Sequence, residues 1–372
     1  MRGSDTIRQG KPIEAVELFA GIGGFRVACD RVGIQTQWAN DIDPKAAQVY
    51  CDRFGAAQFH LGDLVTLLDS IPPHDLLTAG FPCQPFSSAG KKLGLADPRG
   101  TLLGRVVEVL DRHRPPFFVL ENVKRLLSMD RGQHFATILA ALTPLGYWVE
   151  WRLLNALQFG LPQNRERLII IGHRADRPLA YLGLAADFQD LPPFLAVPWS
   201  SLAQLRKRFQ NWGLAYNNQF IQADLPYFSA HITPPKLSDI LEKQPDDRFY
   251  FTADTQARIQ HSERVDRYIN GVEVLYNQRG GSRMGYSIFG TNGVAPTLTC
   301  TTSRHYERYQ VGNAFRRLTP VEYARLQGFS DHHCQVISPY HQYSLYGNAV
   351  PPVMIEWVLK QLLNSTGVKL SL

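Results

Sequence analysis

Short apolar runs alternate with helical periods along the first 175 residues of the chain. Strands are predicted where β-branched or aromatic residues cluster between turn residues. Such clusters lie at 15–19, 36–40, 58–61, 75–79, 117–121, 147–155 and 167–171. This alternation is typical of an α/β fold, in which helices cover a largely parallel sheet.

Helices are predicted between these strands and again near the C-terminus. Proline suits the first turn of a helix, so Pro44 is expected to open one. Thr319 and Glu322 form a capping box for a later helix, which Gly328 closes. The predicted helices span 44–54, 101–113, 132–145, 319–328 and 352–364.

The alternation disappears between about residues 175 and 315, where proline, glycine, asparagine and isolated aromatic residues dominate. We predict a flexible tail at 1–12, a main domain from 13–175 plus 316–372, and a smaller domain at 176–315. The smaller domain is expected to be irregular and mostly β. The last block is too short to fold alone, so we expect it to pack on the main domain.

The composition excludes several classes of protein. Hydrophobic residues make up 44% and charged residues 19% of the chain, as in ordinary globular proteins, and no apolar run suits a membrane span. The N-terminus lacks the apolar segment of a secretory signal. Five widely spaced cysteines without a C-x-x-C pair suggest neither a disulfide framework nor a zinc site. We expect a cytoplasmic protein without metal.

Positive charge is concentrated in one stretch of the smaller predicted domain. Between Arg264 and Arg317 there are eight arginines, no lysine and three acidic residues, a net charge of +5, with five tyrosines interleaved. Arginine suits bidentate contacts to phosphate and guanine, and tyrosine donates hydrogen bonds to phosphate. The stretch indicates a nucleic-acid partner, with a solvated basic face as the alternative.

A glycine turn follows the first predicted strand. Ala20-Gly21-Ile22-Gly23-Gly24 allows backbone N–H groups to approach a ligand closely. A full dinucleotide motif would need glycine at Arg26, so a pyrophosphate is poorly supported. Asp41, 17 residues beyond Gly24, ends the second strand, where a carboxylate can accept hydrogen bonds from ribose. A nucleoside such as S-adenosylmethionine fits better; a tight turn without a ligand is the alternative.

Two reactive groups follow strands that we expect to be neighbours. Cys83 lies in a proline-stiffened loop after the strand at 75–79, where α/β proteins bind ligands. Glu121 ends the next strand, and partial desolvation there should raise its pKa and favour a protonated form. Neighbouring strands are about 5 Å apart, so both groups would share one pocket. The alternatives are a buried small residue and a strand-end ion pair.

Arg165 and Arg167 precede an apolar run. In a strand, residues two apart share a face, so both guanidinium groups are expected to aim at one anionic or carbonyl group. A solvated R-x-R pair is the alternative.

Together these segments resemble the C5-cytosine DNA methyltransferase family of prokaryotic restriction-modification systems. Eight blocks appear in the family order, over 15–174 and 315–358. They are ELFAGIGGFR, NDIDPKA, GDL, GFPCQPFSSAG with DPRGTL, ENV, QNRER, TPVEYARLQGF and YGNAVPP. Between them only Pro296-Thr297-Leu298-Thr299 matches, as expected where such enzymes differ in the DNA sequence they recognise. The resemblance implies a Rossmann-like S-adenosylmethionine-dependent methyltransferase domain and a target-recognition domain.

The resemblance also implies a chemistry. The Cys83 thiolate would add to C6 of a flipped cytosine while Glu121 protonates or hydrogen-bonds N3, and C5 would take the methyl group, leaving S-adenosylhomocysteine as product. Arg165 and Arg167 would hold the cytosine carbonyl or a nearby phosphate. The partner would be double-stranded DNA, bound by a monomer close to the nucleoid, and a cognate restriction endonuclease is left open.

By the same resemblance, residues from these eight blocks would contact the cofactor. The family often has glutamate and a bulky aromatic at the positions of Asp41 and Ile42, so weaker cofactor binding is expected here rather than loss of activity. The implied cofactor contacts are Phe19, Gly21, Gly23, Gly24, Asp41, Ile42, Asp63, Leu64, Pro82, Leu102, Asn348 and Ala349. The implied DNA contacts are Gln84, Ser87, Arg279, Arg283, Thr297 and Arg304.

Three other functions are weighed against this prediction. A tRNA cytosine-5 methyltransferase has the same catalytic blocks, but the chain lacks the Cys-Phe-Thr tripeptide of those relatives and carries a long Arg- and Tyr-bearing insert. A catalytically inactive DNA-binding relative is disfavoured because Cys83, Glu121 and both arginines are present. An unrelated Cys-dependent enzyme does not explain the glycine turn and the Asn348 block together.

Overall fold

The computed structural model describes residues 11–81, 102–174, 184, 208–217, 219–227, 232–278, 286–300 and 307–365. The chain forms two compact units. Unit 1 comprises 1–154, 167–228 and 353–372, and unit 2 comprises 155–166 and 229–352.

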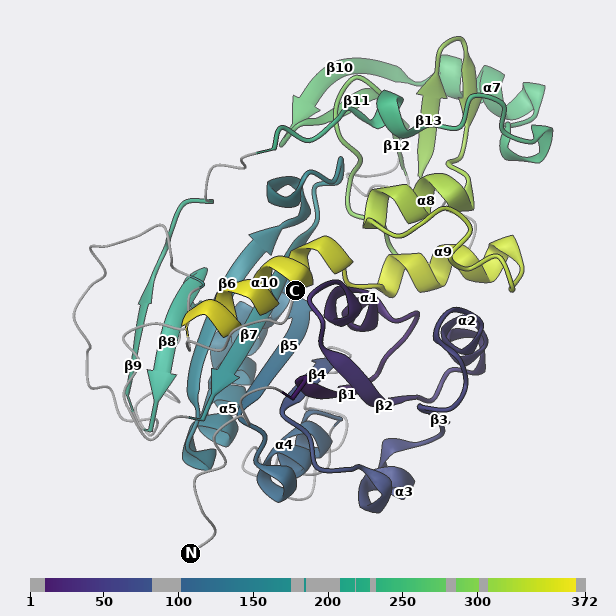
Figure 1. Cartoon of the computed structure of the whole chain (residues 1–372). Helices are drawn as coiled ribbons and strands as arrows, with labels where there is room; N and C mark the ends of the chain where they lie inside the picture. The colour runs from purple at the N-terminus through teal and green to yellow at the C-terminus, as the bar shows by residue number, and fades with distance from the viewer. Residues whose placement is uncertain are drawn as a thin grey trace, which may run out of the picture. The chain divides into compact units, whose positions relative to one another are not determined.

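Unit 1 is built on a nine-stranded sheet with the order β3-β2-β1-β4-β5-β7-β6-β8-β9 (Figure 1). Its first five members are parallel, and β7 joins β5 in the antiparallel sense. The strands are β1 (Glu14–Leu18), β2 (Gln35–Asp41), β3 (Phe59–Leu61), β4 (Leu76–Gly80), β5 (Phe117–Val123), β6 (Trp148–Asn155), β7 (Glu166–His173), β8 (Trp212–Tyr216) and β9 (Gln219–Ala223).

The helices of unit 1 begin where the sequence places caps and prolines. Asp43 accepts a hydrogen bond from the Lys45 backbone N–H, and Pro44 occupies the first turn. Helix α2 therefore spans the predicted residues. The helices are α1 (Gly24–Arg31), α2 (Pro44–Phe54), α3 (Leu64–Leu67), α4 (Leu102–His113), α5 (Gln133–Leu142) and α10 (Pro352–Ser365).

The two faces of β1 serve different neighbours. Val16 and Leu18 belong to one large apolar cluster with residues of α4 and α5, so these helices cover that face of the sheet. Successive strand residues point to opposite faces, so Glu17 points away from this cluster. On the other side, α1 and α10 are linked by an ion pair between Arg31 and Glu356 at 3.5 Å.

All seven predicted strands of the first 175 residues are confirmed, with ends that differ by up to two residues. Two strands were missed. β8 pairs with β6 and with β9, so residues 212–223 extend the large sheet. Their apolar patterns, Trp-Gly-Leu-Ala-Tyr and Gln-Phe-Ile-Gln-Ala, are too short to stand out from the irregular stretch around them.

Among its described residues, unit 2 contains a five-stranded sheet with the order β10-β11-β12-β13-β14 (Figure 1) and three α-helices. The strands are β10 (Glu263–Ile269), β11 (Val272–Asn277), β12 (Ser287–Phe289), β13 (Arg308–Val311) and β14 (Ala314–Arg316). The helices are α7 (Ala253–Gln260), α8 (Pro320–Gln327) and α9 (Pro339–Asn348), of which α7 and α9 were not predicted.

The capping box of α8 is present as predicted, and its glutamate also has a structural partner. The Thr319 side chain accepts from the Glu322 backbone N–H, and the Glu322 carboxylate accepts from the Thr319 backbone N–H. Arg316 donates to both carboxylate oxygens of Glu322 at 2.7 and 2.8 Å, and both side chains are buried. The start of α8 is thereby tied to β14.

The compact units divide the chain differently from the predicted domain boundaries. Residues 212–223, which were assigned to the smaller domain, fall in unit 1 because β8 pairs with β6 and β9 pairs with β8. The segment 316–352, which was assigned to the main domain, falls in unit 2, so of the helices described in the C-terminal block α8 and α9 belong to unit 2 and α10 to unit 1. In the described part of the chain, no helix has the length and apolar character needed to cross a bilayer.

Candidate active site

The parallel strands of unit 1 end at one edge of the sheet, where α/β proteins bind ligands. Gly80 of β4 pairs with Glu121 of β5, so the two strands are neighbours as predicted. The chain continues from Gly80 through Phe81 toward Cys83. Cys83 itself lies outside the described residues, as do Pro82, Gln84 and Ser87.

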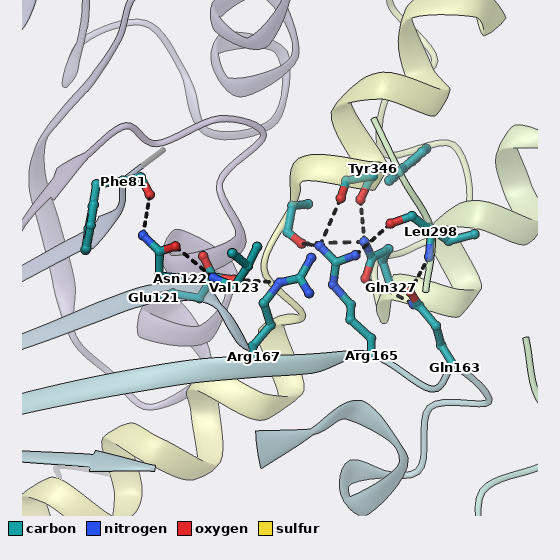
Figure 2. Close-up of polar contacts among 12 residues, drawn as sticks. Phe81, Glu121, Asn122, Val123, Gln163, Arg165, Arg167, Leu298, Gln327 and Tyr346 are labelled. Atoms are coloured by element: carbon teal, nitrogen blue, oxygen red, sulfur yellow. Dashed lines mark hydrogen bonds and ion pairs between the residues drawn. The ribbon is translucent and has the colours of Figure 1, made fainter. Parts of the chain in front are cut away.

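Glu121 forms an ion pair with Arg167 at this edge. The Glu121 Oε1 and Arg167 Nε atoms are 2.8 Å apart, and each side chain is 10% exposed. Arg167 comes from β7, which lies antiparallel beside β5. Burial lowers the pKa of Arg167 and the Glu121 carboxylate acts in the opposite direction. The pair places a carboxyl group and a guanidinium group side by side where water only partly screens their interaction (Figure 2).

Asn122 connects the end of β5 to the start of the cysteine loop. Its Nδ2 donates to the Phe81 backbone carbonyl at 2.9 Å, and its Oδ1 accepts from the Val123 backbone N–H at 2.8 Å (Figure 2). Asn122 is buried, so these bonds are shielded from solvent. The ENV block thus holds the residue two positions before Cys83.

Arg165 has a different environment from Arg167. It lies in unit 2, is fully buried, and donates to three backbone carbonyls, those of Leu298 at 3.0 Å, Gly347 at 2.9 Å and Ala349 at 2.8 Å (Figure 2). The expectation that Arg165 and Arg167 aim together at one group is therefore not met. The Arg165 guanidinium instead donates its hydrogen bonds to main-chain carbonyls of unit 2.

Two glutamines complete the polar centre around Arg165. Gln163 Nε2 donates to the Leu326 carbonyl at 3.0 Å, and its Oε1 accepts from the Leu298 N–H at 3.0 Å. The Gln327 side chain lies beside Gln163, 3.2 Å away, and donates to the Tyr346 carbonyl. All of these side chains are buried, so they join four chain segments inside unit 2 (Figure 2).

The glycine turn is an open left-handed turn between β1 and α1. Phe19, Gly21 and Gly23 have φ angles of 54°, 55° and 80°, a left-handed conformation that the two glycines adopt without strain and Phe19 does not. A Cβ atom at Gly23 would lie 2.4 Å from the Phe54 ring and 3.2 Å from the Tyr50 ring. Glycine is needed there because the turn rests directly on two aromatic side chains of α2.

Asp41 closes this turn from the end of β2. Its Oδ2 accepts from the Gly21 N–H at 2.7 Å and its Oδ1 accepts from the Asp43 N–H at 2.9 Å. Burial raises the pKa of Asp41, while the two N–H groups act to lower it. Each carboxylate oxygen has two lone pairs, so both retain capacity for a ligand hydroxyl.

The neighbouring predicted cofactor residues lie at the ends of β2 and β3. Ile42 is an exposed apolar side chain, with 66% of its surface accessible. Asp63 is exposed and caps α3 through the Val65 N–H at 3.0 Å, whereas Leu64 is buried. Leu102, at the start of α4, is half-buried. An apolar face and two carboxylates thus lie around the turn.

The remaining predicted residues belong to unit 2 or are not described. Asn348 is exposed at the end of α9, and Ala349, which follows it, is half-buried. Thr297 donates from Oγ1 to the Asn164 carbonyl at 2.6 Å, so its hydroxyl proton is engaged within unit 2. Arg279, Arg283 and Arg304 lie outside the described residues.

Sequence reasoning missed one acidic residue near the turn. Glu17 is buried in β1 and accepts a hydrogen bond from the Tyr50 hydroxyl at 3.0 Å. An acid between the apolar residues Val16 and Leu18, directly before the turn that begins at Leu18-Phe19, was the available signal. No cluster of His, Cys, Asp and Glu able to hold a metal ion occurs among the residues that the structure describes.

Solved structures show a likeness in fold. A Dnmt2 methyltransferase of S. pombe matches with a TM-score of 0.63 at 17% identity, over 95% of this chain and 98% of the other. The Entamoeba histolytica methyltransferase EhMeth matches with a TM-score of 0.63 at 17% identity, over 96% and 99%. Both are consistent with a Rossmann-like methyltransferase fold.

Sequence relatives extend the likeness to the level of family. The Type II methyltransferase M.DsaV of Dactylococcopsis salina is 32% identical over 95% of this chain and 87% of its own length. M.NgoBI of Neisseria gonorrhoeae is 34% identical over 92% and 90%, and M.HaeII of Haemophilus aegyptius is 33% identical over 95% and 94%.

The family model for C-5 cytosine-specific DNA methylases matches residues 13–364, which span both units. The match covers 87% to 94% of the lengths of these relatives, and the eight blocks quoted from the sequence all fall inside the family match. The chain therefore belongs to the C-5 cytosine-specific DNA methylase family and is a DNA (cytosine-5)-methyltransferase.

Proposed function

We propose that Cys83, Glu121 and Arg167 methylate C5 of a cytosine in duplex DNA, with S-adenosylmethionine as methyl donor. The ion pair between Glu121 and Arg167 is the observation that carries this proposal. It lies at the carboxyl edge of the sheet, beside the strand that leads to Cys83. A thiol, a carboxyl group and a guanidinium group at one such edge suit addition to an electron-poor ring.

Cytosine C5 is not nucleophilic enough to take a methyl group without activation. The Cys83 thiolate adds to C6 while Glu121 protonates or hydrogen-bonds N3, which leaves an enamine-like, nucleophilic C5 to which bound S-adenosylmethionine would supply the methyl group. A base, either water or a side chain, then removes the C5 proton, and Cys83 leaves. Arg167 orients Glu121 and stabilises charge that develops on the cytosine carbonyl. We assign Arg165 no contact with the base.

The substrate base must leave the duplex before Cys83 can reach C6. Stacking and pairing cover C6 in B-form DNA, so enzymes of this kind extrude the target nucleotide. The description of the family, C-5 cytosine-specific DNA methylase, favours DNA over the tRNA alternative. The active-site blocks of this chain argue against the catalytically inactive alternative.

The residues at the glycine turn fit S-adenosylmethionine. The turn offers backbone N–H groups, Asp41 offers lone pairs for the ribose hydroxyls, and exposed Ile42 offers an apolar surface for adenine. When bound, the cofactor supplies an electrophilic methyl group on sulfonium. Phe19, Gly23, Gly24, Asp63, Leu64, Pro82, Leu102, Asn348 and Ala349 are the further contacts that we propose.

We assign target recognition to residues 176–315, with the Arg- and Tyr-rich part in unit 2 carrying most of it. Gln84 and Ser87 would contact DNA near the flipped base, and Arg279, Arg283, Thr297 and Arg304 would contact the duplex. The Type II names of the relatives suggest a restriction-modification enzyme with a cognate endonuclease. We further propose a monomer that acts in the prokaryotic cytoplasm, bound to nucleoid DNA.

Transfer of labelled methyl groups to duplex DNA tests this function. Cys83→Ala should abolish transfer and leave DNA binding intact, whereas Cys51→Ala, a matched change at a half-buried helical cysteine, should retain it. Duplex DNA with 5-fluorocytosine at the target should form a denaturant-resistant adduct, because fluorine cannot leave as a proton. Turnover by Cys83→Ala would rule out the covalent mechanism.

Bisulfite sequencing of a methylated DNA library would identify the recognised sequence and the methylated cytosine in one experiment. Methylation of tRNA but not of the library would favour the alternative substrate.

A further inference from the structure

Glu17 is a buried carboxyl group on β1, directly behind the glycine turn. It is 1% exposed, and its Oε2 accepts from the Tyr50 hydroxyl at 3.0 Å. Its Oε1 has no hydrogen-bond partner in the described part of the structure. A buried carboxylate normally needs several donors, whereas a neutral acid needs fewer. This environment suits the protonated form.

The charged groups around Glu17 do not compensate a negative charge fully. Arg26 and Asp30 on α1 act on it with opposite signs, and they pair with each other at 2.8 Å. The other titratable neighbours are Tyr50 on α2 and Cys29 on α1. Burial is the dominant influence, and it raises the pKa of Glu17 to about 8. The partners of Glu17 on β2 and β4 are Ala39 and Thr78, which do not titrate.

Tyr50 connects Glu17 to the glycine turn through a hydrogen bond and ring packing. Its ring packs against Phe54 with a centroid distance of 4.8 Å, and both rings lie under Gly23. Arg26 adds a cation–π contact, 5.3 Å from the Phe54 ring centre. The bond between Glu17 and Tyr50 therefore fixes the aromatic pair on which the turn rests. The same turn is also held by Asp41, whose carboxylate accepts a hydrogen bond from the Gly21 backbone N–H.

We propose that Glu17 is a positioning residue for the cofactor turn and that it acts as a neutral carboxylic acid. Ionisation places an incompletely compensated charge in the interior, so the carboxylate moves toward water or Arg26 and draws the hydrogen-bonded Tyr50 hydroxyl with it, out of its packing with Phe54. The aromatic support of Gly23 is then lost and the turn no longer presents its N–H groups to the cofactor. This inference rests on the proposed function, because it takes the turn as the cofactor site.

Calorimetric titration with S-adenosylmethionine between pH 6 and 9.5 tests the inference. Binding by the protonated fraction alone raises the apparent Kd about tenfold from pH 7 to pH 9. Glu17→Gln keeps the shape and stays neutral, so its Kd should lack this rise. The amino group of the ligand also titrates in this range, but equally for both proteins. A constant ratio of the two Kd values across the range would overturn the inference.

Tyr50→Phe provides a second test with a defined direction. The tyrosine hydroxyl stabilises the ionised carboxylate, so its removal raises the pKa of Glu17 and moves the loss of affinity to higher pH. A role in packing alone would leave the midpoint unchanged. Glu356→Gln, at a partly exposed carboxylate on α10, is the matched control and should follow the unaltered protein.

The possible outcomes distinguish a failure of the Glu17 inference from a failure of the proposed cofactor site. If the unaltered protein binds no S-adenosylmethionine at any pH, the proposed cofactor is wrong and the inference fails with it. If it binds with a pH dependence that Glu17→Gln and Tyr50→Phe do not change, the proposed function stands and the inference fails alone.

Discussion

Arg165 and Arg167 lie two positions apart, yet they serve different regions of the molecule. At the sheet edge of unit 1, Arg167 faces the Glu121 carboxylate and keeps a tenth of its side chain accessible. In the centre of unit 2, Arg165 is fully buried and faces the carbonyls of Leu298, Gly347 and Ala349.

The partners explain the difference. A carboxylate with remaining lone pairs can respond to an arriving substrate, and its guanidinium partner can share that substrate. Main-chain carbonyls in a buried centre depend on the arginine for their own hydrogen bonds, so it is not available to a ligand. Residue type and spacing suggested one role for both arginines, whereas the structure gives them different partners, a carboxyl group for Arg167 and main-chain carbonyls for Arg165.

The largest expected effect comes from breaking the pair at the sheet edge. Glu121→Gln preserves shape but cannot protonate cytosine N3, so single-turnover methyl transfer should slow by roughly 10² to 10⁴-fold. DNA binding, measured separately by a fluorescence shift, should be retained. A rate equal to that of the unaltered enzyme would exclude Glu121 as the acid.

Breaking the centre of unit 2 should affect stability instead. Arg165→Ala leaves three buried carbonyls without their donor, and we expect unfolding in denaturant to become easier by about 3 to 5 kcal/mol. Arg165→Lys retains the charge but loses the planar donor group that reaches separate carbonyls. Its free energy of unfolding should therefore lie between those of the unaltered protein and Arg165→Ala. Unchanged stability with lost turnover would instead place Arg165 at the substrate.

A milder change at the sheet edge sharpens the contrast. Arg167→Lys keeps a positive charge near Glu121 but removes the planar donor set, so kcat should fall by about tenfold. The thermal midpoint should change little, since an ion pair is still possible. A large drop in stability with normal kcat would reverse the roles that we assign to the two arginines.

The smallest expected effect is on the pH dependence of stability, and it comes from His74 of unit 1. Burial lowers the pKa of His74 to about 4, so the unfolded chain takes up a proton first as the pH falls below 6.5. The free energy of unfolding therefore decreases as the pH falls from 6.5 toward 4. Between pH 6.5 and 5.5 the unaltered protein should lose about 1 kcal/mol more than His74→Phe.

His261→Gln, at an exposed histidine of unit 2, is the control for this measurement. It should show the same acid sensitivity as the unaltered protein. If His74→Phe were equally sensitive, His74 would not be the group that takes up the proton.

Much of the fold could be predicted because its signals are local. Hydrophobic runs located the seven strands of the first 175 residues, and Pro44 and the capping box at Thr319 marked helix starts correctly. The glycine turn with Asp41, and the neighbouring strands of Cys83 and Glu121, followed from strand order and the rule for parallel sheets. Burial, capping and turn geometry depend mainly on residues close in sequence.

Other features depended on partners far along the chain. β8 joined the large sheet because β6 offered a free edge, and α9 was missed because its apolar residues follow no clear stripe. Whether Arg165 meets a substrate or three carbonyls is decided by segments more than 130 residues away. The sequence by itself determined which chemical groups this methyltransferase carries and where seven of its strands lie along the chain. Only the tertiary structure decided which of those groups face a ligand, because hydrogen-bond partners are chosen by proximity in space.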